Sequence, residues 1–450
     1  MLTPATLTTV SRLTSWLRSR SDAQLPRGVL RGTLLPFLLI ALCPFAVVLL
    51  WYACQSWDGA LTHAAARASL SRMLLEWPWP TRSSVSIVLG FAAWQALLMV
   101  ALPGKRVLGP VTPAGARVQY KVNGLLAWAL THLALYVACF RLEWFSPTIV
   151  YDHFGSIIMT CNLFALVFCA FLYLKGVYSP SGRDAGRSGN PVFDFFWGTE
   201  LHPRLFDFEL KQFANCRFGM MSWTIIILSF LFKQRALYGH VSTSMLVSVA
   251  LQVIYVVKFF WWEDGYLASL DMMHDRFGFY ICWGVMTWLP AVYTSQALYL
   301  VRHPIALGPF VTIALLVAGV IAIYVNYDAD AQRQRVRRTN GATTVWGRAP
   351  KLIVAEHRTA DGQVKQSLLL ASGWWKISRH FHYLAELAAA LAWTLPCGFH
   401  HYLPYFYVTF LTILLFDRAL RDDRRCSAKY GRHWQEYCRL VPHRIIPRVF

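Results

Sequence analysis

Residues near the C-terminus carry side chains suited to binding a polar ligand. The segment RDDRRCSAKYGRHWQEY, residues 421–437, follows the apolar run 402–416. Asp422, Cys426 and Tyr430 recur every four residues, so on a helix they would form one stripe. Lys429 flanks this stripe, and Tyr437 lies two turns further on. Two interpretations are open: a helix end whose charges pair with each other, or the polar wall of a ligand pocket.

Arginine and aromatic residues gather in a second region, between residues 332 and 383. Arg333 and Arg337 are four apart and would share one face of a helix. Guanidinium groups bind phosphate well, although a basic loop beside a membrane is the simpler interpretation. Trp375, His382 and Tyr383 follow at helical spacing where the next apolar run starts. They would either stack on a flat ring or form an aromatic girdle at the membrane surface.

Ionisable residues also occur inside or beside apolar runs. Such groups are costly at membrane depth and usually face a cavity or each other. The candidates in residues 252–280 are Tyr255, Glu263, Asp271, His274 and Asp275. A lone tyrosine in an apolar helix is also a common core residue, so Tyr255 is either a proton donor or part of the packing. Residues 189–223 form either an interfacial stretch or a re-entrant segment that lines a cavity.

Long apolar runs must position these side chains. The chain has 450 residues, of which 56% are hydrophobic and 15% charged, against about 25% charged in an average soluble domain. This composition predicts an all-α polytopic membrane protein. About ten runs have the length of spanning helices. They cover residues 33–54, 85–103, 124–140, 155–174, 219–233, 242–262, 277–300, 308–326, 380–396 and 402–416.

The positions of the basic residues predict the orientation in the membrane. The net charge is +20, but the basic residues lie between the apolar runs, which favours cytoplasmic loops and not nucleic-acid binding. With ten spans, the basic N-terminal segment and residues 104–123, 327–379 and 417–450 fall on one face. We therefore expect both termini in the cytoplasm. The acidic segment 263–276 fits this orientation less well.

Common motifs for metals, nucleotides and hydrolysis are missing from the sequence. The cysteines show no CxxC pair or Cys/His spacing, so we expect no metal site. Neither a glycine-rich dinucleotide fingerprint after a strand nor a phosphate-binding P-loop occurs. The residues themselves thus predict a membrane protein with a cytoplasmic pocket rich in arginine and aromatic side chains. They leave the reaction open.

Five segments of the sequence resemble the sterol reductases, enzymes that saturate double bonds of sterols with NADPH. These are GTELHPRLFDFELKQF, HDRFGFY, RRTNGATTVWGRAP, LLLASGWWKISRHFHY and RDDRRCSAKYGRHWQEYCRLVPHRIIPRVF. Residues 33–175 match that family only in pattern and spacing. Within the family, QRQRVRRTNG, SGWWKISRHFHY, LLFDRALRDDRRC and HRIIP look most like the sterol C7-reductases, especially those of plants.

The resemblance implies ten spans and an NADPH pocket, not of the Rossmann type, in the C-terminal half. Arg333 and Arg337 would meet the cofactor phosphates. Leu370, Trp375, His382 and Tyr383 would line the nicotinamide or its ribose. The rest of the pocket wall would consist of Asp422, Cys426, Ser427, Ala428, Lys429, Tyr430 and Tyr437.

Four parts of the chain follow from this assignment. Residues 1–32 would form a cytoplasmic N-terminal segment, and residues 33–218 the N-terminal membrane helices with a polar loop. Residues 219–326 would form central helices around a sterol pocket, and residues 327–450 the NADPH-binding part with two further membrane helices. The membrane would be the endoplasmic reticulum in a eukaryote or the cytoplasmic membrane in a bacterium.

The implied reaction is reduction of the C7=C8 double bond of a Δ5,7-sterol. Because this bond is not conjugated to a carbonyl group, a proton must be delivered so that hydride can add. In the resembling enzymes the position of Tyr255 holds the proton donor, and Asp422 and Tyr430 would form the relay behind it. Glu263, Asp271 and Asp275 are the expected substrate-binding residues.

Three alternatives to this reaction remain at the level of sequence. Relatives in the same family reduce the C14 or the side-chain C24 double bond. An isoprenylcysteine-type methyltransferase has a similar C-terminal helix, but the pair Arg333 and Arg337 argues against it. A catalytically inactive sterol-binding scaffold, of the lamin B receptor type, is the third.

Overall fold

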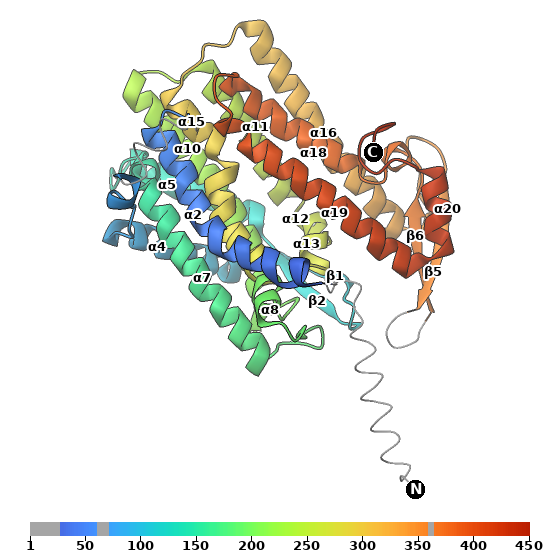
Figure 1. The fold of residues 1–450 in the computed structure, drawn as a ribbon. Helices are drawn as coiled ribbons and strands as arrows, with labels where there is room; N and C mark the ends of the chain where they lie inside the picture. Colours follow the sequence, from blue (N-terminus) through green and yellow to red (C-terminus); the bar gives the residue numbers. More distant parts are fainter. Residues whose placement is uncertain (1–27, 61–71, 359–363) are drawn as a thin grey trace.

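Long helices that lie side by side make up most of this computed structural model, which describes residues 28–60, 72–358 and 364–450 (Figure 1). The long helices are α2 (Leu35–Ser56), α4 (Arg82–Ala101), α5 (Gly124–Phe140), α7 (Phe154–Tyr178), α10 (Met220–Tyr238), α11 (Thr243–Trp261), α16 (Pro309–Arg338), α18 (Phe381–Thr394) and α19 (Phe406–Tyr430). The predicted N-terminal segment 1–32 lies almost entirely outside the described residues.

Shorter helices connect the long ones. They are η1 (Leu30–Leu34), α6 (Ile149–Asp152), α8 (Pro191–Trp197), α9 (Leu210–Gln212), η2 (Phe213–Gly219), α12 (Glu263–Tyr266), α13 (Leu270–Met273), α14 (Phe279–Trp283), η3 (Gly284–Tyr293), α15 (Ser295–Arg302), α17 (Trp374–Ile377), η4 (Leu395–Cys397), η5 (Leu403–Tyr405) and α20 (Arg432–Leu440). Among these, η1, η2 and η3 are π-helical, and η4 and η5 are 3-10 turns.

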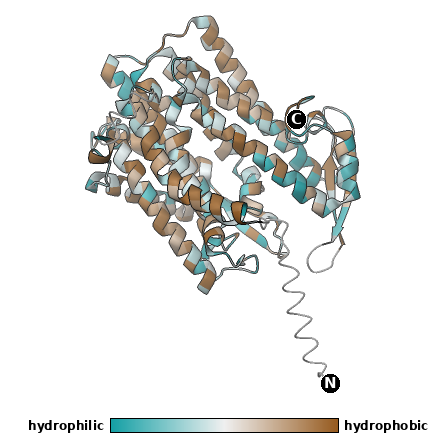
Figure 2. Cartoon of the chain, viewed as in Figure 1, coloured by the Kyte–Doolittle hydropathy of each residue, from teal (hydrophilic) through white to brown (hydrophobic). Residues whose placement is uncertain are grey.

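Seven helical segments in the described residues are long and apolar enough to cross a membrane, as expected of an integral membrane protein. They are Leu30–Ser56, Arg82–Ala101, Phe154–Tyr178, Leu210–Tyr238, Thr243–Trp261, Pro309–Arg338 and Leu403–Tyr430. The apolar part of Leu210–Tyr238 is 72% buried, whereas that of Pro309–Arg338 is 17% buried. Leu210–Tyr238 therefore lies inside the bundle, whereas the apolar part of Pro309–Arg338 lies at its outer surface. Hydrophobic residues make up most of the long helices (Figure 2).

The other three predicted runs are also helical, but none forms one unbroken helix long enough to cross a membrane. Run 124–140 is the shorter apolar helix α5. Run 380–396 is α18, which has 14 residues and continues into the 3-10 turn η4. Run 277–300 is divided into α14, η3 and α15, with Pro290 inside η3. Proline has no N–H to donate, so the regular hydrogen-bond pattern cannot continue through it.

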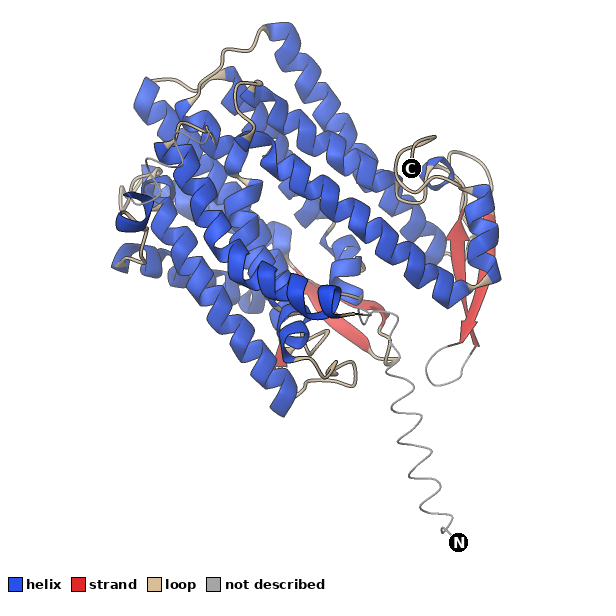
Figure 3. Ribbon diagram, in the orientation of Figure 1, coloured by secondary structure: helices blue, strands red, loops and turns tan. Residues whose placement is uncertain are grey.

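The prediction of an all-α fold is wrong in detail, because three two-stranded antiparallel sheets occur in the described residues (Figure 3). They pair β1 (Lys105–Val111) with β2 (Arg117–Val122), β3 (Arg204–Leu205) with β4 (Phe208–Glu209), and β5 (Leu352–Arg358) with β6 (Val364–Leu370). The β5–β6 hairpin packs against α19 and α20. Helical periodicity is a poor guide to such strands, since their side chains alternate with a period of two.

A buried ion pair ties several of these elements together. Both side chains, Arg217 on η2 and Glu263 on α12, are fully buried, and Arg217 Nη1 lies 2.8 Å from Glu263 Oε1. The backbone N–H of Gly124, at the start of α5, donates to Glu263 Oε2 at 2.8 Å. A Cβ at Gly124 would lie 2.6 Å from that oxygen, so only glycine permits this approach. Glu263, the predicted substrate residue, thus has both carboxylate oxygens engaged within the protein.

Removing either partner of this pair should destabilise the fold strongly. Glu263→Ala leaves the Arg217 guanidinium buried and unpaired, which costs roughly 3–5 kcal/mol. We expect a large fall in the thermal unfolding midpoint of the purified protein in detergent. The double variant Glu263→Ala/Arg217→Ala should lose less than the sum of the two single variants. The exposed pair Arg72–Glu76 is the control, and Glu76→Ala should leave the unfolding midpoint nearly unchanged because solvent screens this pair. Equal losses for both glutamates would contradict this assignment.

Candidate active site

The polar end of α16 brings Arg333 to an aromatic ring. The Arg333 guanidinium carbon lies 4.3 Å from the centre of the Trp375 ring, and its Nη2 is 2.6 Å from Asp330 Oδ1. Asp330 and Arg333 are three apart on the helix, which is a favourable spacing for an ion pair. Arg337, one turn further on, is exposed to solvent and within electrostatic range of Asp422 and Tyr430. The predicted arginine pair therefore does extend along one helix.

A tight turn places the aromatic side chains that follow. Gly373 has φ +60°, and a Cβ there would lie 2.2 Å from Gln332 Oε1 on α16, so the turn requires glycine. After this turn, Trp375 Nε1 donates to the carbonyl oxygen of Ala329 at 2.7 Å. The Trp375 and His382 rings are 5.1 Å apart between centres. Tyr383 lies 4.3 Å from His382, so the three rings form a continuous wall.

The end of α19 faces this wall with its acidic and sulfur side chains. Asp422, Cys426 and Tyr430 all lie on α19, which confirms that the stripe is helical. Asp422 Oδ1 is 2.5 Å from Arg425 Nη2, and its Oδ2 lies 3.7 Å from both Cys426 Sγ and His380 Nε2. The His380 ring stacks on Tyr383 at 4.9 Å with an interplanar angle of 7°. Asp422 therefore lies next to the aromatic wall.

The β5–β6 hairpin and α20 close the remaining side. The Tyr437 hydroxyl on α20 donates to the carbonyl oxygen of Leu370 at 3.0 Å. The Tyr430 ring lies 5.5 Å from His357 on β5, and Lys429 Nζ lies 5.1 Å from the Tyr430 ring. Cys426 and Tyr437 share a small hydrophobic core with Leu369 of β6. Ser427 and Ala428 lie on the exposed side of α19.

These contacts bring most of the predicted residues into one region, which we call the C-terminal cluster. Its members are Arg333, Arg337, Leu370, Trp375, His380, His382, Tyr383, Asp422, Cys426, Tyr430 and Tyr437. Buried polar atoms without a hydrogen-bond partner in the described residues include Arg333 Nε, His380 Nδ1 and His382 Nδ1. Such atoms are costly unless a polar group meets them.

Tyr255 lies apart from this cluster, inside the bundle on α11. Its hydroxyl donates to Glu386 Oε1 on α18 at 2.7 Å, and not to Asp422 or Tyr430. The Trp223 and Trp393 rings lie 5.6 Å and 5.4 Å from the Tyr255 ring. The prediction that Asp422 and Tyr430 form the relay behind Tyr255 thus stays a prediction. The group in direct contact with Tyr255 is a different carboxylate.

The other predicted substrate residues pair with arginines of α19. Asp271 Oδ1 lies 2.5 Å from Arg418 Nη2, which also donates to the Tyr280 hydroxyl at 3.3 Å. Asp275 Oδ1 lies 3.5 Å from Arg421 Nη1. Asp271 and Asp275 therefore hold α19 against the segment that precedes α14. Their role toward a substrate stays a prediction.

The polar residues that the sequence analysis missed include Glu386, Lys258, Arg418 and His380. Glu386 is the only ionisable residue between Tyr383 and Thr394, within an apolar run. An acid in such a run usually faces the interior and pairs there. Its position four residues after His382 places both on one face of a helix. Those two signals were sufficient to single out Glu386.

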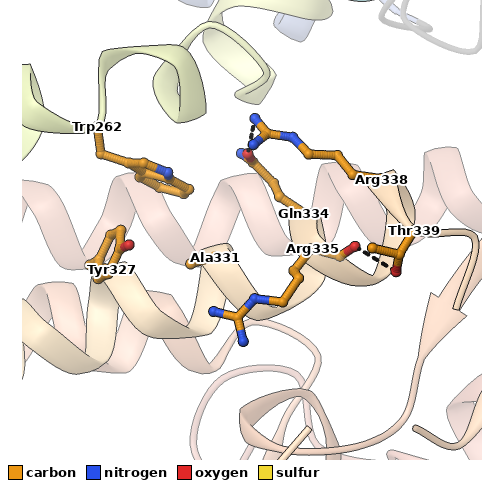
Figure 4. A pocket seen from close by; sticks show the side chains of 7 residues that line it. All are labelled: Trp262, Tyr327, Ala331, Gln334, Arg335, Arg338 and Thr339. Carbon is orange, nitrogen blue, oxygen red and sulfur yellow. Dashed lines mark hydrogen bonds between the residues drawn. The ribbon is translucent and has the colours of Figure 1, made fainter. Parts of the chain in front are cut away.

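A groove on another face of α16 does not belong to this site. It has a cavity volume of about 280 Å³ and contains none of the predicted residues (Figure 4). The side chains that line it are Trp262, Tyr327, Ala331, Gln334, Arg335, Arg338 and Thr339. Arg338 is engaged there, because its Nη2 lies 3.1 Å from Asp264 Oδ2. The two faces of α16 thus present separate sets of arginines.

Comparison with known proteins identifies the family. The sequence profile of the ergosterol biosynthesis ERG4/ERG24 family matches residues 52–450. The chain belongs to this family. It is 50% identical over 416 residues to a 7-dehydrocholesterol reductase of Arabidopsis thaliana, covering 92% of this chain and 96% of that protein. The resemblance that the sequence motifs indicate is therefore confirmed.

Two further relatives cover a similar share of the chain. A 7-dehydrocholesterol reductase of Xenopus laevis is 39% identical over 430 residues, covering 92% of this chain and 91% of that protein. A Delta(14)-sterol reductase of Methylotuvimicrobium alcaliphilum is 37% identical over 417 residues, covering 92% of this chain and 94% of that protein. Membership of the ERG4/ERG24 family argues against the methyltransferase alternative.

Burial of the C-terminal cluster should make the protein sensitive to acid. Burial lowers the pKa of the His380 imidazole to about 3, although the nearby Asp422 carboxylate opposes this. The unfolded chain takes up a proton near pH 6.5, whereas the folded chain resists it down to about pH 3. Stability therefore falls as the pH falls through this window. Burial also lowers the pKa of His274 to about 3, with the same sign.

Replacing His380 should flatten this pH dependence. His380→Gln keeps a polar side chain next to Asp422 but does not titrate, so its free energy of unfolding should fall less steeply below pH 6.5. The difference should be about 1.4 kcal/mol per pH unit for one group, with His274 still contributing. Chemical unfolding of the purified protein between pH 7 and pH 4.5 checks this. Exposed His400 gives the control variant His400→Gln, which should follow the wild type. Equal slopes for all three proteins would contradict the prediction.

Proposed function

We propose that this protein is an NADPH-dependent sterol C7-reductase that saturates the C7=C8 double bond of a Δ5,7-sterol. The observation that carries the proposal is the 50% identity to the Arabidopsis 7-dehydrocholesterol reductase over nearly the whole of both chains. The relative named for Delta(14) reduction is less similar, at 37%. The C7 position is therefore preferred over C14 and over the side-chain C24 bond.

The C-terminal cluster fits a nicotinamide dinucleotide with a phosphorylated ribose. Arg333 and Arg337 supply two fixed positive charges, which suit phosphate groups. The unpartnered nitrogens of His380 and His382 offer hydrogen bonds next to the ring wall of Trp375 and Tyr383. The two-stranded β5–β6 sheet cannot supply the parallel sheet that a Rossmann fold needs. When bound, NADPH would supply hydride.

The protein itself must deliver the proton. Tyr255 is the proposed donor, because its hydroxyl lies in the bundle interior next to a carboxyl group. The rings of Trp223 and Trp393 on either side could stabilise the cationic charge that develops on the sterol. Asp422 would hold the cofactor side of the site through its contacts with His380 and Cys426. Tyr430 remains a proposed member of the relay.

The finer topology is also part of the proposal. We propose ten spans, in which α5, α18 and the divided helix α14–η3–α15 also cross the membrane. Both termini would then face the cytoplasm, with the C-terminal cluster on the same side. The membrane would be the endoplasmic reticulum in a eukaryotic host and the cytoplasmic membrane in a bacterial host.

A turnover assay tests the reaction. Purified protein in detergent would receive NADPH with a Δ5,7-sterol or a Δ8,14-sterol, and the products would be read by gas chromatography–mass spectrometry. We expect conversion of the Δ5,7-sterol, a rate lower by about 10²- to 10⁴-fold in Tyr255→Phe, and loss of turnover in Asp422→Ala. Tyr151→Phe is the control variant. It removes a hydroxyl that donates to Gln55 Oε1 outside the proposed site, and it should keep the wild-type rate.

Each other outcome of this assay overturns a stated part of the proposal. Conversion of the Δ8,14-sterol alone would keep the family and overturn the C7 position. No conversion of either sterol, with NADPH still bound, would favour a side-chain reductase or an inactive sterol-binding scaffold.

Replacing Arg337 tests whether this side chain binds a phosphate group of NADPH. Arg337→Ala should raise KM for NADPH by about 10- to 100-fold, because a hydrogen bond to a charged group contributes about 1.5–3 kcal/mol. If Arg337 meets the 2′-phosphate, KM for NADH should barely change. Arg335→Ala is the matched control, since Arg335 lines the groove on another face of the same helix (Figure 4). Equal effects of the two variants would contradict the placement of the phosphate.

A further inference from the structure

A carboxyl group lies directly behind the proposed proton donor. Glu386 Oε1 accepts the hydrogen bond of the Tyr255 hydroxyl at 2.7 Å. Glu386 is on α18, one helical turn after His382, which lines the C-terminal cluster. α18 packs against both α11 and α16. One short helix thus carries a residue of the ring wall and the partner of Tyr255.

Polar side chains continue from Tyr255 back to the cluster. Lys258 Nζ lies 4.3 Å from the centre of the Tyr255 ring and donates to Asn326 Oδ1 at 2.8 Å. Asn326 Nδ2 in turn donates to the backbone carbonyl oxygen of His382 at 3.1 Å. These bonds join α11, α16 and α18 around Glu386. Isolated polar groups at this depth would be costly, so the network must form as a unit.

Charged groups face Glu386 from each of these helices. Tyr255 of α11 bonds it directly, and Lys258 of α11, Asp330 of α16 and Arg418 of α19 lie within electrostatic range. Two positive groups and one acid therefore surround this carboxyl. The two positive groups would stabilise the carboxylate that remains after Glu386 gives up its proton.

We propose that Glu386 is the group that returns a proton to Tyr255 during turnover, an inference that rests on the proposed sterol reduction. The Tyr255 O–H bond breaks as a C–H bond forms on one carbon of the double bond. Bound NADPH would supply the hydride that the neighbouring carbon needs, and would leave as NADP⁺. The proton of the Glu386 carboxylic acid moves to the Tyr255 oxygen, and Glu386 is reprotonated from water.

The geometry favours Glu386 over Asp422 for this step. Proton transfer needs heavy atoms within about 2.6–3.2 Å, and the Tyr255–Glu386 distance meets that limit. Asp422 is engaged by Arg425 at 2.5 Å and lies beside His380 near the C-terminal end of α19. Asp422 thus belongs to the cofactor side of the site, and Glu386 to the proton side.

Glu386→Gln separates proton transfer from packing. Glutamine keeps the size of the side chain and an oxygen that accepts from Tyr255, but it cannot release a proton. We expect kcat to fall by about 100-fold or more, with KM for sterol and for NADPH within about threefold of the wild type. Glu386→Asp should recover part of the rate. The double variant Glu386→Gln/Tyr255→Phe should be no slower than Tyr255→Phe, because the two residues act as one unit.

A second measurement does not depend on turnover. Infrared spectra of the protein without cofactor should show the carbonyl stretch of a protonated carboxylic acid that disappears in Glu386→Gln. Glu200→Gln is the matched control, because Glu200 is a buried acid that pairs with Lys175 outside the site. It should keep both the infrared band and the rate per folded enzyme.

The outcomes distinguish this inference from the proposed function. If wild type converts the Δ5,7-sterol and Glu386→Gln converts it equally fast, the proton role is overturned and the reductase stands. Absence of the infrared band in the wild type would also overturn the proton role. If wild type converts neither sterol, the proposed function fails and the role of Glu386 fails with it.

Discussion

The cost of placing charged groups inside an apolar helix bundle governs the arrangement of this protein. Ionisable groups at membrane depth are tolerated when each has a partner. The buried pair Arg217–Glu263 and the half-buried pair Asp271–Arg418 meet this condition, as does the Tyr255–Glu386 hydrogen bond. Each pair also joins helices that are distant in sequence. The polar groups that chemistry requires are therefore the same groups that fix how the helices pack.

The C-terminal cluster forms because two long helices continue beyond their apolar parts. α16 ends in an arginine- and glutamine-rich turn, and α19 ends in the acidic and basic segment that carries Asp422. The β5–β6 hairpin and α20 then pack between and beside these ends. A polar ligand at this place would meet helix ends on one side and the start of α18 on the other. The apolar parts of the same helices remain available to face lipid.

The parts of the fold that could be predicted are those with a local signal. Apolar runs predicted the helices, and the stripe of Asp422, Cys426 and Tyr430 predicted one face of α19. The β5–β6 hairpin was missed, although Asp361–Gly362 is a turn signal between alternating segments. Tertiary pairing was harder still. Nothing local shows that Glu263 meets Arg217, or that Tyr255 meets Glu386, because those contacts join residues 46 and 131 apart.

The position of α18 links the two halves of the proposed chemistry. Its first turn presents His382 and Tyr383 to the cluster that would hold the hydride donor, and its second turn presents Glu386 to Tyr255. A helical turn rises about 5.4 Å, so the ring wall and the partner of Tyr255 lie one turn apart along α18. A rigid helix keeps the separation between these side chains constant. Under the proposed function, α18 therefore links the cofactor side of the site to the proton side at a fixed spacing.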